Sequence, residues 1–330
     1  MGKIKGLSEG LRVKRRALIM GSLAVGLTAA QPLQRVVLAS DWYAQAEHGG
    51  FYQAIATGIY AQAGLDVHIQ IGNTSLSIMQ LLAARAVDFA MGAAVSALQS
   101  LAAGIPVVTV AALFQKNPQV LLTHPHTPPY RLEDLRGHPI YVSAGANVTY
   151  WPFLRQRYGF DDGQKRPYTG SLAPFLLDAV SVQQGYLTSE PYRVRQEAGF
   201  DPGVILLADY GYNPYATTIE TRQELVREKP DLVRRFVQAS IQGWESYLRD
   251  PAPAHGLIKQ NNPNISDGLL AYAHRTMQEQ QIVQGGDAIR HGIGTMNPQR
   301  WQAMAELLVS TGAIPQEIPY AQAFTLEFVG

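Results

Sequence analysis

Strand-like apolar runs alternate with helical patterns through the first third of the chain. The apolar runs lie at residues 35–41, 65–72, 87–92 and 106–114, and the helical patterns between them at 49–64, 73–86 and 94–104. Gly64 and Gly104 stand where helices commonly end on a left-handed residue, and Asn73, Thr74 and Ser75 are candidate N-caps. This order predicts an α/β layer with a mostly parallel sheet.

A second α/β unit follows the first. A helical turn before Gly137, a helix at 149–159 and strands at 139–145, 179–188 and 204–211 are expected there. After about Glu220 the pattern predicts helices only, one of them beginning near Pro230, and the glycine-rich residues 285–294 are expected to form a loop.

The helical tail has no core of its own, so we expect it to pack on the first unit. The chain would then cross between two lobes near residues 115–125 and again near 207–216. Two crossing strands make a hinge, and the cleft between two hinged lobes is the natural place for a ligand.

The N-terminus carries a basic segment followed by an apolar one. Fourteen apolar and small residues at 17–30 are too few for a membrane-spanning helix, which needs about 20. The two segments are typical of a secretory signal peptide cleaved near Ala30, and the alternative is an uncleaved amphipathic helix. The stretch "KRRALIM" also resembles a twin-arginine export signal.

Charge and composition exclude several classes of function. Removing residues 1–30 takes away six of the 27 basic residues and one of the 26 acidic ones, which leaves a net charge of −4 and no basic surface for nucleic acid. The chain has no cysteine, so disulfides, thiolate metal sites and cysteine nucleophiles are excluded. No catalytic motif, phosphate loop or dinucleotide fingerprint is present, and we expect no catalysis, metal or cofactor.

Residues 41–67, "DWYAQAEHGGFYQAIATGIYAQAGLDV", resemble the opening of periplasmic solute-binding proteins of ABC importers. The branch is the one that takes thiamine-pyrimidine precursors, sulfonates, nitrate and taurine. "VDFAMG", "AAGIPVVTVAALFQ", "LEDLRGHPIYVS" and "KPDLVRRFVQASIQGWESYL" are similar as well, so the likeness covers about residues 35–260. Asp41-Trp42, His48 and the "GYLTSEPY" loop are most similar to the pyrimidine-precursor subgroup.

The resemblance implies the two-lobe α/β fold of type II periplasmic binding proteins, with a hinge of two crossing strands and a C-terminal helical segment on lobe 1. We therefore expect a signal peptide at 1–30, lobe 1 at 31–118 and 213–330, and lobe 2 at 119–212. It also implies a monomer in the periplasm that passes a small molecule to ABC permease and ATPase subunits.

The expected ligand is a small planar nutrient, a thiamine-related aminopyrimidine first. The alternatives are a flavin, an aromatic acid, a sulfonate, taurine and nitrate. A distant alternative is a pyrimidine synthase of the same branch, which consumes one of its own histidines. Ser96 aligns with that histidine here, and the relative's cysteine-rich loop aligns with residues 210–215, which hold no cysteine, so both positions argue against that chemistry. Ser96 remains a candidate ligand contact. A sensor lobe of a signalling protein is a third possibility.

The candidate contacts of lobe 1 come from loops at strand ends, which face the ligand crevice in open α/β sheets. Trp42 and Tyr43 could stack on a flat ring or seal the sheet edge. His48 could bond a ligand heteroatom or a backbone group, and Glu47 is expected to be exposed or to face a helix dipole. Asn73 could bind an anion at a helix start or act only as a cap.

The candidate contacts of lobe 2 and the return crossover have alternatives of the same kind. Asn147 could reach the ligand or belong to an ordinary short loop. Tyr186 and Glu190 could hold an aminopyrimidine, Glu190 by a charge-assisted pair of hydrogen bonds, or Glu190 could be a surface residue that caps a helix. Tyr212 and Asn213 could wall the pocket or pack the lobes together.

Overall fold

The computed structural model describes residues 2, 32–72, 78–126, 128, 130–315 and 318–329. Apart from Gly2, the expected signal peptide lies outside these residues, and so do the N-cap candidates Asn73, Thr74 and Ser75. No helix in the described part of the chain is long and apolar enough to cross a membrane.

The described strands form two five-stranded sheets. The first sheet has the order β2-β1-β3-β10-β4, with strands β1 (Gln34–Ala39), β2 (Leu65–Gln70), β3 (Phe89–Ala93), β4 (Val107–Phe114) and β10 (Ala216–Arg222). The second has the order β7-β6-β8-β5-β9, with strands β5 (Gln119–Thr123), β6 (Ile140–Val142), β7 (Lys165–Pro167), β8 (Val182–Tyr186) and β9 (Gly203–Leu206). We call the first sheet with its helices lobe 1, and the second sheet with its helices lobe 2.

Each sheet contains one strand that runs against its neighbours. β10 is antiparallel to β3 and β4, and β5 is antiparallel to β8 and β9, whereas β1, β2 and β3 pair in parallel. These are the strands that enter a sheet directly from the other lobe. Both correspond to the crossing strands expected at the hinge, although β10 begins at the very end of the expected second crossover, 207–216.

The helices fall into three groups along the chain. Those that follow lobe 1 strands are α1 (Gly49–Ala56), α2 (Ile59–Gln62), α3 (Ile78–Ala83) and α4 (Ala94–Ala102). Those of lobe 2 are α5 (Trp151–Tyr158), α6 (Ala173–Leu177) and α7 (Glu190–Ala198). The C-terminal segment holds α8 (Gln223–Glu228), α9 (Pro230–Arg249), α10 (Ala252–Asn261), α11 (Asp267–Glu279), α12 (Ala288–His291) and α13 (Pro298–Ser310).

Two expected elements differ from the structure. The helix predicted at 49–64 is broken into α1 and α2 at Gly58, whose φ of 73° leaves the helical region. The expected loop at 285–294 contains the one-turn helix α12. Gly64 and Gly104 do have the positive φ expected of residues that end helices.

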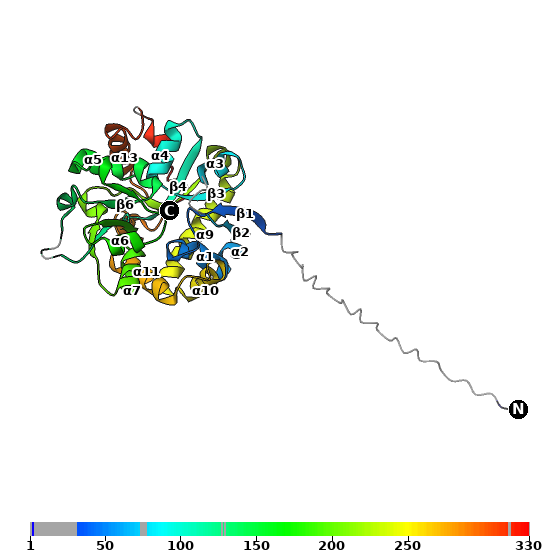
Figure 1. The fold of residues 1–330 in the computed structure, drawn as a ribbon. Coiled ribbons are helices and arrows are strands. Elements are labelled where there is room, and N and C mark those ends of the chain that lie inside the picture. Colours follow the sequence, from blue (N-terminus) through cyan, green and yellow to red (C-terminus); the bar gives the residue numbers. More distant parts are fainter. Residues whose placement is uncertain are drawn as a thin grey trace. The chain divides into compact units, whose positions relative to one another are not determined.

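Helix α9 packs closely on α1, which places this part of the C-terminal segment on lobe 1 as expected (Figure 1), whereas α11 also contacts α7 of lobe 2. A Cβ on Gly243 of α9 would lie 2.3 Å from the carbonyl oxygen of Gly50, so the two helices meet backbone to backbone. A Cβ on Gly50 would in turn lie 2.2 Å from the Trp244 ring. The Gly49-Gly50 pair is therefore explained by helix packing, and this packing fixes the loop that precedes α1.

The two crossovers between the lobes are bonded to each other. The Asn117 backbone N–H donates to Oδ1 of Asn213 at 2.8 Å, and the Asn117 side chain donates to the Pro214 carbonyl at 3.3 Å. The Arg300 guanidinium of α13 also donates to the Asn213 carbonyl, at 2.7 and 3.0 Å. The hinge is thus tied both across its two strands and to the C-terminal segment.

Candidate functional site

The loops after β1 and β8 meet where the lobes face each other. The loop after β1 leads through Asp41, Trp42 and Tyr43 into the 3₁₀ helix η1 (Ala46–His48), and the loop after β8 runs from Tyr186 to Ser189. The Thr188 hydroxyl donates to Oε1 of Glu47 across the interlobe contact. The Tyr272 hydroxyl of α11 also donates to the Leu187 carbonyl, at 3.1 Å.

Glu47 is buried, so the expectation that it is exposed was wrong. Only 4% of the residue is accessible, and Thr188 is fully buried. Burial raises the pKa of Glu47, while the hydrogen bond from Thr188 opposes the rise. A carboxylate buried in this way needs its hydroxyl partner, because an unpartnered charge in the interior is costly.

His48 lies beside Asp41. Its Nε2 is 3.0 Å from Oδ1 of Asp41, and 2% of the histidine is exposed. The other ring nitrogen, Nδ1, is buried and has no hydrogen-bond partner among the described residues. His48 therefore bonds a carboxylate rather than the backbone, and it retains one free polar atom.

Trp42 and Tyr43 are the exposed aromatic residues of this loop. Their rings meet edge to face, with centroids 5.6 Å apart, and 38% and 48% of the two residues are accessible. They do not seal the edge of the sheet, and both rings have accessible surface for a flat partner.

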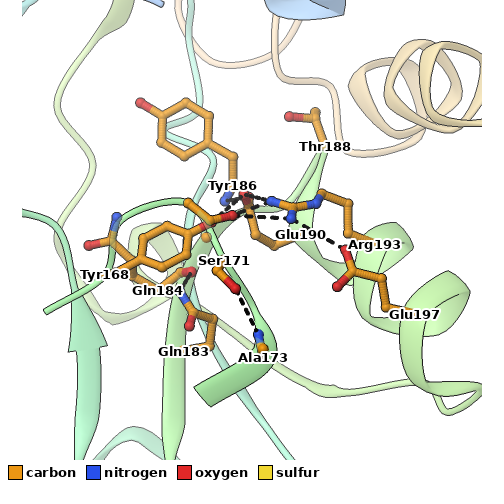
Figure 2. A network of polar contacts seen from close by, with 12 residues as sticks. Tyr168, Ser171, Ala173, Gln183, Gln184, Tyr186, Thr188, Glu190, Arg193 and Glu197 are labelled. Atoms are coloured by element: carbon orange, nitrogen blue, oxygen red, sulfur yellow. Dashed lines mark hydrogen bonds and ion pairs between the residues drawn. The ribbon is translucent and has the colours of Figure 1, made fainter. Parts of the chain in front are cut away.

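Glu190 begins α7 and is held by its own lobe (Figure 2). Its Oε2 accepts the Tyr186 backbone N–H at 2.7 Å, and its Oε1 lies 3.4 Å from the Tyr168 hydroxyl and 3.6 Å from Arg193. Burial raises the pKa of Glu190, whereas the Tyr186 N–H and the charge of Arg193 lower it. Both oxygens thus have partners within lobe 2.

Tyr150, Tyr186 and Tyr212 lie near one another, and Tyr186 also lies near the carboxylates of Asp41, Glu47 and Glu190. Burial raises the pKa of Tyr186, and the charges of Asp41, Glu47 and Glu190 raise it further. Figure 2 shows the Tyr186 ring pointing away from the Glu190 carboxylate. Tyr150 and Tyr212 are buried with ring centroids 6.2 Å apart, and burial is the main cause of the raised pKa of each.

The described remaining candidates, Ser96, Asn147 and Asn213, bond other groups of the protein. Ser96 exchanges hydrogen bonds with the backbone of Ala93 at the start of α4. Asn147 is exposed and accepts from Lys165 at 2.7 Å, and the Asn213 side chain is used in the hinge. Asn73 lies outside the described residues.

Glu220 is an ionisable residue that was not among the candidates. It lies on β10 opposite Ala90 of β3 and Thr109 of β4, and it is fully buried. Thr218 donates to its Oε1 at 3.0 Å, and the Ser96 side chain and the Ala93 backbone also lie beside the carboxyl group. Burial raises the pKa of Glu220 to about 8, and the charge of Asp41 adds to the rise.

Two grooves lie away from these loops. One, of about 580 Å³, is lined by Tyr130, Leu187, Val204, Ile205, Leu206, Asp209, Tyr210 and Gln280. Another, of about 350 Å³, is lined by Pro152, Arg155, Gln156, Phe160, Asp161, Asp162, Ser310 and Thr311. Only Leu187 belongs to the loop after β8. Neither groove is lined by Asp41, Glu47, Glu190, Glu220 or the Trp42–Tyr43 pair.

Comparison with known proteins places the chain in a family. Residues 45–254 match the NMT1/THI5-like family model. The riboflavin-binding protein RibY of Chloroflexus aurantiacus is 30% identical over 311 residues, which cover 91% of this chain and 88% of RibY. A formylaminopyrimidine-binding protein of Halalkalibacterium halodurans is 25% identical over 256 residues, or 73% of this chain and 74% of the relative.

Solved structures show the same fold. The periplasmic aliphatic sulphonate binding protein SsuA of Escherichia coli has a TM-score of 0.67 at 12% identity, with 88% of this chain and 91% of SsuA covered. The desulfurization enzyme DSZB has a TM-score of 0.59 at 14% identity, with 89% of this chain and 97% of that chain covered. The expected periplasmic-binding-protein fold is confirmed, although the fold is shared by binding proteins and by an enzyme. On the evidence of its sequence the chain belongs to the NMT1/THI5-like family.

Proposed function

We propose that the protein is the solute-binding component of an ABC importer. It captures a planar nitrogen heterocycle between its lobes and passes it to a membrane permease without a chemical step. We place it in the periplasm, after removal of residues 1–30, and take it to act as a monomer with lobe boundaries near 118/119 and 212/213.

The observation that carries the proposal is the meeting of two strand-end loops from different sheets. The contact between Thr188 and Glu47 joins these loops, and the half-exposed rings of Trp42 and Tyr43 lie in the same loop as Asp41. Strand ends that face each other across a hinge are where α/β proteins hold ligands. Aromatic rings beside hydrogen-bonding groups suit a flat ring with polar edges.

The flavin ring of riboflavin is the first candidate ligand, and an aminopyrimidine is the second. RibY, the relative that covers 91% of this chain, is named for riboflavin, and the second relative is named for a formylaminopyrimidine. Both molecules are flat and carry donors and acceptors on their edges. The geometry favours such a ring over a small tetrahedral anion, because carboxylates dominate the interlobe contact.

The test is a binding screen on the mature protein. Riboflavin, an aminopyrimidine alcohol, taurine and benzoate are compared by thermal shift and by tryptophan fluorescence, since a tight ligand raises the melting temperature. Trp42→Ala should weaken binding by roughly three- to tenfold, the loss of one stacking contact. Leu177→Ala, at an exposed residue of α6, is the control.

Two results would count against the proposal. Binding of none of the compounds would remove the basis for a solute-binding role. A bound compound that mass spectrometry finds chemically changed would indicate an enzyme.

A further inference from the structure

Helix α11 is fixed to lobe 1 and to the hinge. Its side chains Leu270 and Met277 are buried in the apolar cluster that also contains residues of α1 and α9. Beyond its end, the Ile282 carbonyl accepts the backbone N–H groups of Gln115 and Lys116, at 2.7 and 3.1 Å. These two residues begin the first crossover, so the end of α11 is bonded to the hinge.

The same helix also contacts lobe 2, where it lies beside α7 (Figure 1). The Tyr272 hydroxyl donates to the Leu187 carbonyl at 3.1 Å, and the centroids of the Tyr272 and Tyr192 rings are 5.4 Å apart. A Cβ on Gly268 would lie 2.1 Å from the Tyr192 hydroxyl oxygen, so that ring fills the space beside the start of α11. We call these contacts of Gly268 and Tyr272 with Leu187 and Tyr192 the α7–α11 seam.

The seam holds the part of lobe 2 that carries candidate ligand contacts. Leu187 directly follows Tyr186, and Tyr192 lies in the first turn of α7, which Glu190 begins. The Leu187 backbone N–H donates to the Pro118 carbonyl at 2.8 Å, in the first crossover. The loop after β8 is therefore bonded to the crossover through one backbone group of Leu187 and to α11 through the other.

A second contact between the lobes is more apolar than the seam. One buried cluster includes Leu98 of α4, Phe153 of α5 and Trp301 of α13, and so joins helices that lie on different lobes. Tyr192 and Tyr272 are only partly buried. Water can replace the hydrogen bond of the seam, whereas separating the cluster would expose large apolar side chains. The seam is therefore the contact that separates more readily.

We propose that the α7–α11 seam is a latch that holds the lobes closed when no ligand is bound, and that the ligand enters and leaves only when the seam opens. Tyr272 is its positioning residue, because it bonds the loop after β8 rather than the ligand. This inference rests on the proposed function and adds how exchange at that site is regulated.

A latch of this kind acts on rates. Because the empty protein is held closed, the seam must open before the ligand enters and again before it leaves. Weakening the seam should therefore raise the association and the dissociation rate constants by the same factor, while their ratio, Kd, changes little. Loss of a direct ligand contact, as proposed for Trp42→Ala, should raise the dissociation rate constant alone.

The first test is stopped-flow fluorescence of riboflavin with the mature protein. Tyr272→Phe should raise both rate constants by about two- to tenfold, the equivalent of one hydrogen bond, with Kd within about twofold of wild type. Gly268→Ala, which displaces the Tyr192 ring, should act in the same direction. The controls are Tyr320→Phe, whose hydroxyl bonds Gln302 within the C-terminal segment, and Gly256→Ala on α10, where a Cβ would meet no atom within 4 Å.

The second test needs no ligand. The chain has no cysteine, so Thr188→Cys introduces a single thiol at a fully buried position of the interlobe contact. Its labelling by a maleimide reports how often the lobes separate. Labelling should be about two- to tenfold faster when Tyr272→Phe is added than when Tyr320→Phe is added, the same hydrogen-bond equivalent.

Three results have distinct meanings. Rate constants equal to those of wild type in both seam variants, or a faster dissociation without faster association, would overturn the latch while leaving a solute-binding protein. Equal labelling of the two cysteine-containing variants would overturn it as well. Failure of riboflavin and of the other screened compounds to bind would overturn the proposed function, and the labelling rates would still decide whether the seam holds the lobes together.

Discussion

Glu220→Gln should stabilise the protein, and by an amount that grows with pH. Burial raises the pKa of the Glu220 carboxyl from its ordinary value of 4.5 to about 8. Between these two values the folded protein keeps a proton that the unfolded chain has released. The folded state therefore binds more protons, and the stability of the wild-type protein falls as pH rises through this window.

The size of the effect follows from the width of the window. Each pH unit inside it costs the wild-type protein about 1.4 kcal/mol, so the loss reaches roughly 3 kcal/mol at pH 7 and roughly 5 kcal/mol above pH 8. Glutamine does not titrate and avoids this loss. Glu47 and Glu190 also have raised pKa values. Both residues are present in the wild-type and in the variant protein, so their effects on stability cancel in the difference between the two unfolding free energies.

The assay is urea denaturation of wild-type and Glu220→Gln protein at pH 5, 6, 7 and 8, with Glu306→Gln as the control. The difference in unfolding free energy should increase by about 2–3 kcal/mol between pH 5 and pH 7 and level off above pH 8. The control should show no trend. A difference that stays constant over this range would refute the reasoning, because it would mean that Glu220 has an ordinary pKa in the folded protein.

Three other substitutions test the packing and the lobe contacts. Thr188→Val keeps the shape of the side chain but leaves Glu47 without its hydrogen-bond donor, so the free energy of unfolding should fall by about 1–3 kcal/mol at pH 8. An unchanged denaturation midpoint would contradict the contact between Thr188 and Glu47. Gly243→Ala should destabilise by about 1–3 kcal/mol, although alanine is the better helix former, and a more stable variant would show that α1 and α9 are not in backbone contact. Asn213→Ala removes the acceptor for the Asn117 N–H and should lower the melting temperature, while ligand affinity measured by calorimetry stays within about twofold. A large loss of affinity would instead assign Asn213 to the ligand.

The alternating order of strands and helices in the first third of the chain could be predicted because its signals are local. Apolar runs, helical stripes and the glycines at 64 and 104 each act within a few residues. The structure confirms β1 to β4 and the positive φ of Gly64 and Gly104. Strand β10 was expected only as a return strand of the hinge, and its bounds could not be predicted for the opposite reason. Thr218, Glu220 and Thr221 make "ATTIETR" polar on both faces, and only its position between β3 and β4 explains why it is buried.

The candidate site could be predicted in part, because some of its signals are also local. The loops after β1 and β8 could be identified as strand ends, and the structure brings both to the interlobe contact. The burial of Glu47 could not be foreseen, because its partner Thr188 is 141 residues away in the sequence. Thr188 does lie in a loop that the sequence marks, yet nothing local distinguishes it from its neighbour Ser189.

The bonded crossovers limit how the molecule can open. Because the Asn117 amide is tied to Asn213 and Pro214, the two connecting segments act as one ribbon rather than two independent tethers. A ribbon of this kind resists sliding and twisting much more than bending across its width. Opening should therefore be a rocking motion about one axis, and the residues that lie farthest from that ribbon would travel furthest and be the first to separate.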